Sequence, residues 1–159
     1  MIRAVYPGTF DPVTLGHVDI AMRAAAMFDE VVVAVYDLPP KSLTFTTEER
    51  IDLWRQCLDG KPNITVRAYV GVTVDLAHEV GARVLVRGLR ALSDFLYEQE
   101  MALTNKRLAP DVEAVLMMSS LDYLYLSSSR MKELWSLGKP MADMVAPPVA
   151  AALAKKFPL

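Results

Sequence analysis

Cysteine, histidine and long apolar runs are scarce in this chain of 159 residues. Its one cysteine, Cys57, excludes an internal disulfide and is typical of a reducing compartment, so we expect a cytoplasmic location. Two histidines and no cysteine cluster argue against a built-in zinc site. No segment reaches the roughly 18 apolar residues of a membrane-spanning helix, and the first residues lack the pattern of a secretory signal. We therefore expect no membrane partner.

An excess of one charge is also lacking. The chain has 17 basic and 19 acidic residues, which gives a formal net charge of −2. Proteins that bind nucleic acid usually have a basic face, so we expect no nucleic-acid partner. A small phosphorylated ligand needs only a few local cations, and these occur at Arg87, Arg90, Lys106 and Arg107. The length and the absence of a linker predict one domain over residues 1–159.

Three common active-site motifs are missing as well. The chain has no P-loop motif, Gly-x-x-x-x-Gly-Lys-Ser/Thr, and no Gly-x-Gly-x-x-Gly fingerprint after its first predicted strand. It also has no Gly-x-Ser-x-Gly nucleophile elbow, and no acidic residue can be identified that would orient His17. These absences exclude a P-loop phosphate site and argue against a serine hydrolase.

The chain does contain short apolar segments that alternate with segments of helical periodicity. The predicted strands are Ile2–Tyr6, Val31–Tyr36, Ile64–Ala68, Val84–Val86 and Glu113–Met117. The predicted helices are Gly16–Phe28, Thr46–Leu58, Val74–Val80, Ser93–Leu108, Ser127–Leu137 and Pro148–Lys156. This alternation predicts an α/β fold with a Rossmann-like, doubly wound parallel five-stranded sheet. Ligands of such sheets bind beyond the carboxyl ends of the strands.

The segment Ala4–His17 has the pattern of a strand, a turn that contains Pro7 and Gly8, and the start of a helix. Such a loop presents free backbone N–H groups and the positive end of a helix dipole, which suits a phosphate group. His17 follows Gly16 at this helix start. From these few residues, His17 is either a ligand-binding residue or a capping or packed side chain.

Other polar residues lie near predicted strand ends and helix starts. Arg87 and Arg90 flank a Gly-Leu pair after a buried strand, where they either hold phosphate oxygens or are solvated. Lys41 lies in a loop at another strand end and, taken alone, is typical of a solvated lysine. Ser127–Ser129 can donate hydroxyl and N–H groups to an anion or simply cap a helix.

Together these segments resemble the bacterial phosphopantetheine adenylyltransferase family, within the nucleotidyltransferase superfamily with the Thr/His-x-Gly-His motif. The first matching segment is Tyr-Pro-Gly-Thr-Phe-Asp-Pro-Val-Thr-Leu-Gly-His at 6–17, and the others are 45–50, 87–98 and 126–129. The resemblance implies a nucleotidyltransferase domain that transfers the adenylyl group of ATP to 4'-phosphopantetheine. The products are dephospho-coenzyme A and pyrophosphate.

The resemblance also implies the residues of the site. His17 stabilises the transition state, with Lys41 and Arg90 as further catalytic residues. ATP contacts are implied for Thr9, Phe10, His17, Gly88, Leu89, Arg90, Glu98, Tyr123, Leu124, Tyr125, Leu126, Ser127, Ser128 and Ser129. Contacts to 4'-phosphopantetheine are implied for Thr9, Lys41, Thr73 and Arg87, and further ones for Asn105 and Glu133.

The implied reaction is an in-line attack without a covalent intermediate. The attacking phosphate monoester has a second pKa of ~6, so it needs no general base at neutral pH. Mg²⁺ is expected to arrive with ATP, held by phosphate oxygens and water rather than by protein ligands. The expected partners are ATP, 4'-phosphopantetheine, dephospho-coenzyme A, coenzyme A as an inhibitor, and other copies of the chain in a homohexamer.

Two alternatives stay open. A related nucleotidyltransferase could act on another phosphorylated acceptor, such as nicotinate mononucleotide or a small phosphorylated alcohol. A non-catalytic module on the same fold could bind a nucleotide or coenzyme A. The presence of His17 and of all the expected cations argues against this second alternative.

Overall fold

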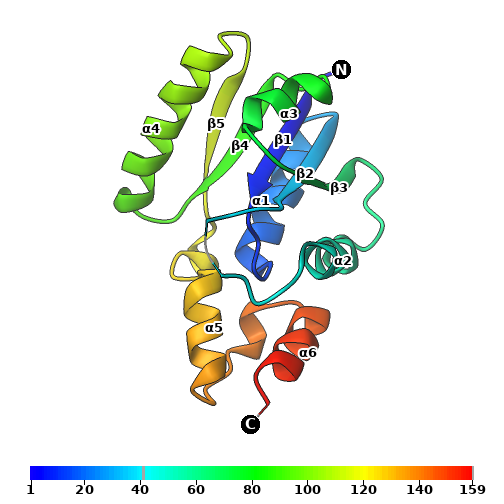
Figure 1. Ribbon diagram of the computed structural model, residues 1–159, viewed down its shortest axis with the longest axis vertical. Coiled ribbons are helices and arrows are strands. Elements are labelled where there is room, and N and C mark those ends of the chain that lie inside the picture. Colours follow the sequence, from blue (N-terminus) through cyan, green and yellow to red (C-terminus); the bar gives the residue numbers. More distant parts are fainter. Residues whose placement is uncertain (41, 159) are drawn as a thin grey trace.

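The computed structural model describes residues 1–40 and 42–158, apart from the side chain of Ser93. Its parallel sheet has the strand order β3-β2-β1-β4-β5 (Figure 1). The strands are β1 (Arg3–Gly8), β2 (Glu30–Tyr36), β3 (Ile64–Tyr69), β4 (Val84–Leu89) and β5 (Glu113–Met118). The strand order reverses between β1 and β4, so the expected ligand position is the carboxyl end of these two strands. The predicted doubly wound sheet is confirmed.

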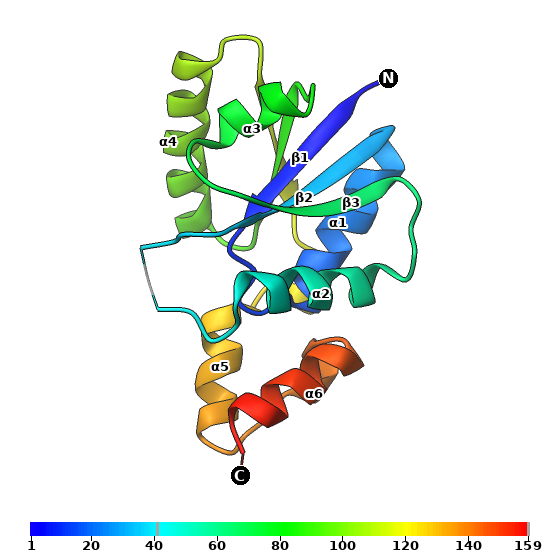
Figure 2. The same cartoon turned by 45° about the vertical axis from the view of Figure 1, so that its right-hand side comes forward.

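Helices cover both faces of this sheet. They are α1 (Leu15–Met27), α2 (Thr47–Leu58), α3 (Thr73–Glu79), α4 (Leu92–Leu108), α5 (Ser128–Ser136) and α6 (Pro147–Lys156). Two short 3-10 helices, Leu121–Tyr123 and Ala142–Met144, precede α5 and α6. In two views, α3 and α4 lie on one side of the strands, whereas α5 and α6 lie beyond their carboxyl ends (Figures 1 and 2). Within the described residues, no helix combines the length and apolarity needed to cross a membrane.

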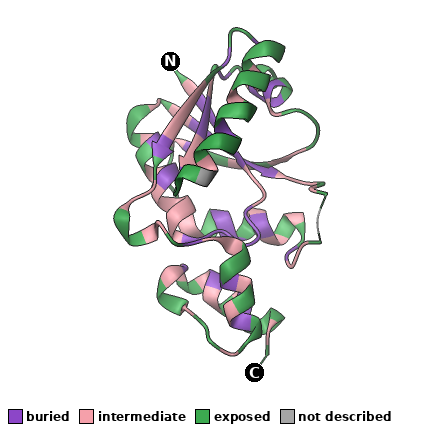
Figure 3. Ribbon diagram, turned by 90° about the vertical axis from the view of Figure 1, so that its left-hand side faces the viewer, coloured by how far each residue is buried: buried purple, intermediate pink, exposed green. Residues whose placement is uncertain are grey.

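The two central strands β1 and β2 are buried along most of their length and mainly apolar, whereas the edge strands β3 and β5 are more exposed. In β2, Val31, Val33 and Val35 face the core formed with α1, α2, α5 and α6. Val32 and Ala34, on the opposite face, pack in a second core with α3. In contrast, α4 is exposed along most of its length (Figure 3).

The first and fourth strands are longer than predicted, and both differences affect the site. The prediction that Arg87–Leu89 follow a strand is wrong, because β4 continues through these residues while it pairs with β5. Arg90 is the first residue after the strand. In the same way β1 continues through Pro7 and Gly8, which were predicted in a turn, because it pairs there with β2. Local composition does not show where a partner strand supplies hydrogen bonds.

Candidate active site

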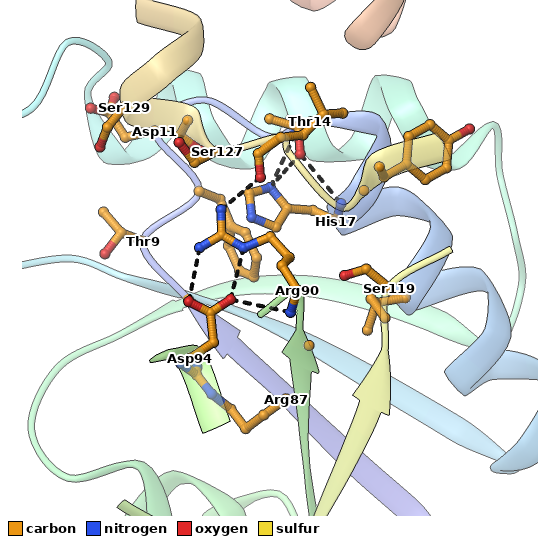
Figure 4. Close-up of a pocket in the computed structure, with 18 of the residues that line it drawn as sticks. Thr9, Asp11, Thr14, His17, Arg87, Arg90, Asp94, Ser119, Ser127 and Ser129 are labelled. Atoms are coloured by element: carbon orange, nitrogen blue, oxygen red, sulfur yellow. Dashed lines mark hydrogen bonds and ion pairs between the residues drawn. The ribbon is translucent and has the colours of Figure 1, made fainter. Parts of the chain in front are cut away.

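A cavity of about 570 Å³ opens beyond the carboxyl ends of β1 and β4, a volume typical of ligand sites (Figure 4). It brings together segments far apart in the sequence. The residues predicted to contact ATP that line it are Thr9, Phe10, His17, Gly88, Arg90, Glu98, Tyr123, Leu126, Ser127, Ser128 and Ser129. Leu89, Leu124 and Tyr125 lie outside this lining, so their ATP contacts stay predictions.

A second cavity of about 270 Å³ adjoins the first on the side of α3 and α4. Thr73 and Asn105, which were predicted to contact the pantetheine arm, both line it. Glu133 does not, and its carboxylate pairs with Arg130 on α5. The two cavities share Thr9 and Arg87, both of which were predicted to contact the acceptor phosphate. The predicted contact of Lys41 lies outside the described residues.

The loop between β1 and α1 is fixed by the ring of Phe10. This residue has a φ of 52°, a conformation that is costly for a residue with a side chain. Its ring packs edge-on against Tyr6, His17 and Trp54 at centroid distances of 5.3, 5.1 and 5.0 Å. A Cβ atom at Gly8 would lie 2.6 Å from this ring, so Gly8 is required for the packing. The loop is therefore held rigidly beside His17.

The tautomer of His17 follows from its neighbour Thr14, the N-cap of α1. The backbone N–H of Thr14 donates to Nδ1 of His17 at 3.1 Å (Figure 4). Burial of the ring, together with the nearby charges of Arg90 and Arg87, lowers the pKa of His17 to about 3. The ring is therefore neutral at physiological pH and carries its proton on Nε2. A backbone N–H orients this histidine, which explains why the sequence offers no acidic partner for it.

Arg87 is held by protein groups on two sides. Its Nε and Nη2 donate to the two carboxylate oxygens of Glu98, each at 2.7 Å, and Nη1 donates to the carbonyl oxygen of Pro7 at 2.6 Å. A guanidinium has five N–H groups. Three are used in these contacts with the described residues, so two remain for a ligand. Glu98 is 7% exposed, and the structure places it as the partner of Arg87. Its predicted contact with ATP stays a prediction.

Arg90 repeats this arrangement at the next position along the cavity. Its Nε and Nη2 donate to Asp94 at 3.0 and 3.4 Å, and Nη1 donates to the carbonyl oxygen of Leu126 at 2.6 Å. Figure 4 shows this arginine between Asp94 and His17. Each arginine is thus oriented by a carboxylate and a carbonyl group before any ligand binds. Arg87 lines both cavities, whereas Arg90 lines only the larger one.

The serines at the start of α5 fix this helix in place and border the larger cavity. Ser127 caps the helix, because its hydroxyl accepts the N–H of Arg130 at 3.1 Å, which confirms the predicted capping. The hydroxyl of Ser128 donates to the carbonyl oxygen of Pro12 at 2.7 Å, which fixes α5 against the loop after β1. The positive end of the α5 dipole therefore borders the larger cavity, where it favours an anion.

Asp11 and Lys132 also line the larger cavity, and neither was predicted as a site residue. Their charged groups are 2.5 Å apart, and Asp11 is 3% exposed. The signal that could have indicated Lys132 is its place on α5, one helical turn after the serines that begin this helix. Asp11 gave no signal of its own, because an aspartate in a Pro-rich turn usually serves the turn.

The charged side chains that line the larger cavity balance one another, so a phosphate group would be held by oriented N–H donors and the α5 dipole rather than by net positive charge. The three carboxylates of this cavity are each paired with a cation: Asp11 with Lys132, Asp94 with Arg90, and Glu98 with Arg87. In the part of the chain that the structure describes, no group of three or more His, Cys, Asp or Glu side chains could hold a metal ion. Oriented arginines, a neutral histidine and a helix N-terminus at the switch point define a nucleotide-binding α/β protein.

Comparisons with known proteins give the family. Residues 5–134 match the cytidylyltransferase-like family. A phosphopantetheine adenylyltransferase from Desulforudis audaxviator is 52% identical over 154 residues, which cover 97% of this chain and 94% of that one. One from Heliobacterium modesticaldum is 48% identical over 157 residues, covering 99% and 94%. The chain belongs to the phosphopantetheine adenylyltransferase family of cytidylyltransferase-like proteins, as the motifs predicted.

A solved structure supports the fold independently. A protein from Vibrio parahaemolyticus, provisionally named a nicotinate-nucleotide adenylyltransferase, superposes with a TM-score of 0.69 at 17% sequence identity. The match covers 96% of this chain and 99% of that one. It confirms the Rossmann-like fold.

Proposed function

We propose that this protein transfers the adenylyl group of ATP to 4'-phosphopantetheine, forming dephospho-coenzyme A and pyrophosphate. The observation that carries the proposal is the junction of the two cavities at Thr9 and Arg87. A nucleotide in the larger cavity and an acceptor arm in the smaller one would bring their phosphates together there. The relatives named phosphopantetheine adenylyltransferase are similar over nearly the whole chain, and they support 4'-phosphopantetheine as the acceptor.

On the nucleotide side, the triphosphate is assigned to Arg90 and the start of α5. An oxygen of the acceptor phosphate attacks the α-phosphorus of ATP, and the bond from that phosphorus to the β-phosphate bridging oxygen breaks. Negative charge grows on the α-phosphoryl oxygens and on the leaving pyrophosphate. The Nε2–H of His17 donates to the α-phosphoryl oxygens, and the two open N–H groups of Arg90 serve the phosphates. Positioning and electrostatics are sufficient, because this nucleophile needs no base.

On the acceptor side, the dianionic phosphate is assigned to Thr9 and Arg87. Thr73 lines the smaller cavity, and its hydroxyl is 3.2 Å from that of Tyr69. Asn105 lies on the α4 side of the same space. An amide-containing arm needs such polar partners within a partly apolar channel.

Mg²⁺ is proposed to enter with ATP. The carboxylates that line the larger cavity are all engaged with cations, so they are poor candidates for a metal cage. Phosphate oxygens and water would therefore hold the ion, which neutralises part of the phosphate charge when bound.

Coenzyme A is proposed as an inhibitor, because it contains the whole product and could occupy both cavities at once. A homohexamer is proposed for the assembly. The exposed apolar side chains of α4 support it as a surface that association would cover: Phe95, Leu96, Tyr97, Met101, Leu103 and Leu108. Sedimentation velocity tests this assembly, and a monomer at micromolar concentration would contradict it.

An acceptor panel tests the reaction. Purified protein is supplied with Mg·ATP or Mg·CTP and with 4'-phosphopantetheine, nicotinate mononucleotide or a phosphorylated alcohol, while pyrophosphate release is measured. We expect release with ATP and 4'-phosphopantetheine. Faster release with another pair would favour the related nucleotidyltransferase, and coenzyme A binding without any turnover would favour the non-catalytic module.

A further inference from the structure

Asp11 joins three separate segments through one buried carboxylate. It accepts the backbone N–H of Thr44 at 3.0 Å and that of Phe45 at 2.9 Å. It also accepts a hydrogen bond from Nζ of Lys132 at 2.5 Å. The loop after β1, the segment before α2 and the second turn of α5 therefore depend on the same side chain, which is 3% exposed.

These segments serve different sides of the larger cavity. Lys132 projects from α5, whose first residues Ser127–Ser129 line the same cavity. Its side chain is 21% exposed, so it is open to a ligand although it is paired. Thr44 and Phe45 belong to the segment that runs from the end of β2 to α2. Tyr36, where this segment begins, lines the smaller cavity, and Ser42 lines the larger one.

Stability alone gives a weak reason for this arrangement. A buried ion pair often stabilises a fold no better than apolar side chains of similar size, because both charges lose their hydration. The two carboxylate oxygens of Asp11 accept from Thr44, Phe45 and Lys132 at the same time, whereas an amide of the same shape has one oxygen to offer. A buried carboxylate is therefore explained if the cation and the backbone beside it must both be held in place.

We propose that Asp11 is a positioning residue for both substrates. Its carboxylate orients the ammonium group of Lys132 toward the pyrophosphate end of ATP and fixes the backbone at Thr44 and Phe45, in the segment that reaches from the smaller cavity to the larger one. An ammonium group has three N–H bonds, and Asp11 accepts one of them, so the others can serve phosphate oxygens. This inference rests on the proposed function and adds a link between its two substrate sites.

A double-mutant cycle on Asp11 and Lys132 tests the first part of the proposal, that Asp11 orients Lys132 for the pyrophosphate end of ATP. Inorganic pyrophosphate binding is measured by calorimetry for Asp11→Asn, Lys132→Met and the double variant. We expect about fivefold weaker binding for Asp11→Asn, because Lys132 loses its orientation, and about thirtyfold for Lys132→Met, which leaves Asp11 as an unpaired negative charge. The double variant should bind about threefold more tightly than Lys132→Met, because that charge is gone.

Steady-state kinetics tests the second part of the proposal, that Asp11 also fixes the backbone at Thr44 and Phe45 for acceptor binding. Asp11→Asn should also raise the KM for 4'-phosphopantetheine about tenfold, since the backbone at Thr44 and Phe45 loses a charged acceptor. Lys132→Met should leave that KM within about twofold. Arg130→Gln is the matched control on α5: it pairs with Glu133, lies outside both cavities and should change neither quantity.

Two results would overturn the proposal. One is a double variant whose loss equals or exceeds the product of the single losses. The other is an Asp11→Asn protein with a lowered Tm and unchanged binding and KM. If Asp11→Asn does not fold, Lys132→Arg replaces it: pyrophosphate affinity near wild type supports the oriented cation, and a loss equal to that of Lys132→Met contradicts it. Because pyrophosphate binding needs no acceptor, it tests the pair even if 4'-phosphopantetheine is not the substrate.

Discussion

Replacing Glu98 by glutamine removes the negative charge that orients Arg87 but keeps the size and shape of the side chain at position 98. Glu98 accepts two hydrogen bonds of 2.7 Å from a guanidinium whose side chain is 31% exposed. A hydrogen bond to a charged group contributes about 1.5–3 kcal/mol, and glutamine can still accept one of the two. With solvent screening at Arg87, we expect the free energy of unfolding to fall by about 2 kcal/mol. For a chain of this length the Tm should fall by about 4–8 °C.

The same substitution should weaken acceptor binding more than ATP binding. In wild type, Arg87 presents its two open N–H groups in a fixed direction where the cavities meet. Without the carboxylate fork, the acceptor phosphate must order this side chain itself. We expect the KM for 4'-phosphopantetheine to rise about tenfold, equivalent to about 1.4 kcal/mol, and the KM for ATP to stay within about threefold. Initial rates of pyrophosphate release with each substrate varied in turn give both values.

Asp94→Asn is the matched comparison, because it releases Arg90 in the same way. In Asp94→Asn the KM for ATP should rise, and the KM for 4'-phosphopantetheine should stay unchanged. If Glu98→Gln instead raised the KM for ATP and left acceptor binding unchanged, Glu98 would be an ATP contact, as the family resemblance implies. The positioning role argued from the structure would then be refuted.

Three further predictions concern residues on either side of the loop after β1: His17 in α1 and Gly8 at the end of β1. His17→Ala should lower kcat by at least about 10²–10³-fold, because one transition-state donor is lost, while calorimetry should show ATP still bound. Below pH 6.5 an unfolded histidine takes up a proton, whereas folded His17 does so only near pH 3. Denaturant titrations should therefore show wild type losing stability relative to His17→Gln as the pH falls from 6.5. Gly8→Ala should cost about 1–3 kcal/mol in the same assay, since its Cβ would meet the Phe10 ring.

Each of these has a clear contrary result. Turnover of His17→Ala near the wild-type rate would remove the assigned role of this side chain. A parallel pH dependence in wild type and His17→Gln would mean that the imidazole can be protonated in the folded protein. A Gly8→Ala protein of unchanged stability would show that the Phe10 ring can move freely away from β1.

Residues whose role depends on local pattern could be predicted from the sequence. Thr46 and Glu49 have the spacing of a capping box, which predicts a helix start at Thr46, and both of its hydrogen bonds are present at the start of α2. The capping serine Ser127 is a further case. Alternation of apolar and helical segments was sufficient for the sheet, because the strands of a parallel sheet covered by helices are mainly apolar.

Residues whose role depends on distant partners could not be predicted in this way. Arg87 was expected after a strand, but pairing of β4 with β5 places it within one. Its fork with Glu98 joins residues 11 apart, and the pair of Asp11 with Lys132 joins residues 121 apart. Such contacts are set by the fold, so family motifs could indicate the residues but not which of them orients another.

Formation of dephospho-coenzyme A from ATP and 4'-phosphopantetheine tests the central claim most directly. The purified protein is incubated with Mg²⁺ and both substrates, and product and pyrophosphate are quantified together by mass spectrometry and an enzyme-coupled assay. We expect equal amounts of the two products and loss of both in His17→Ala. Absence of dephospho-coenzyme A from the wild-type reaction would contradict the central claim.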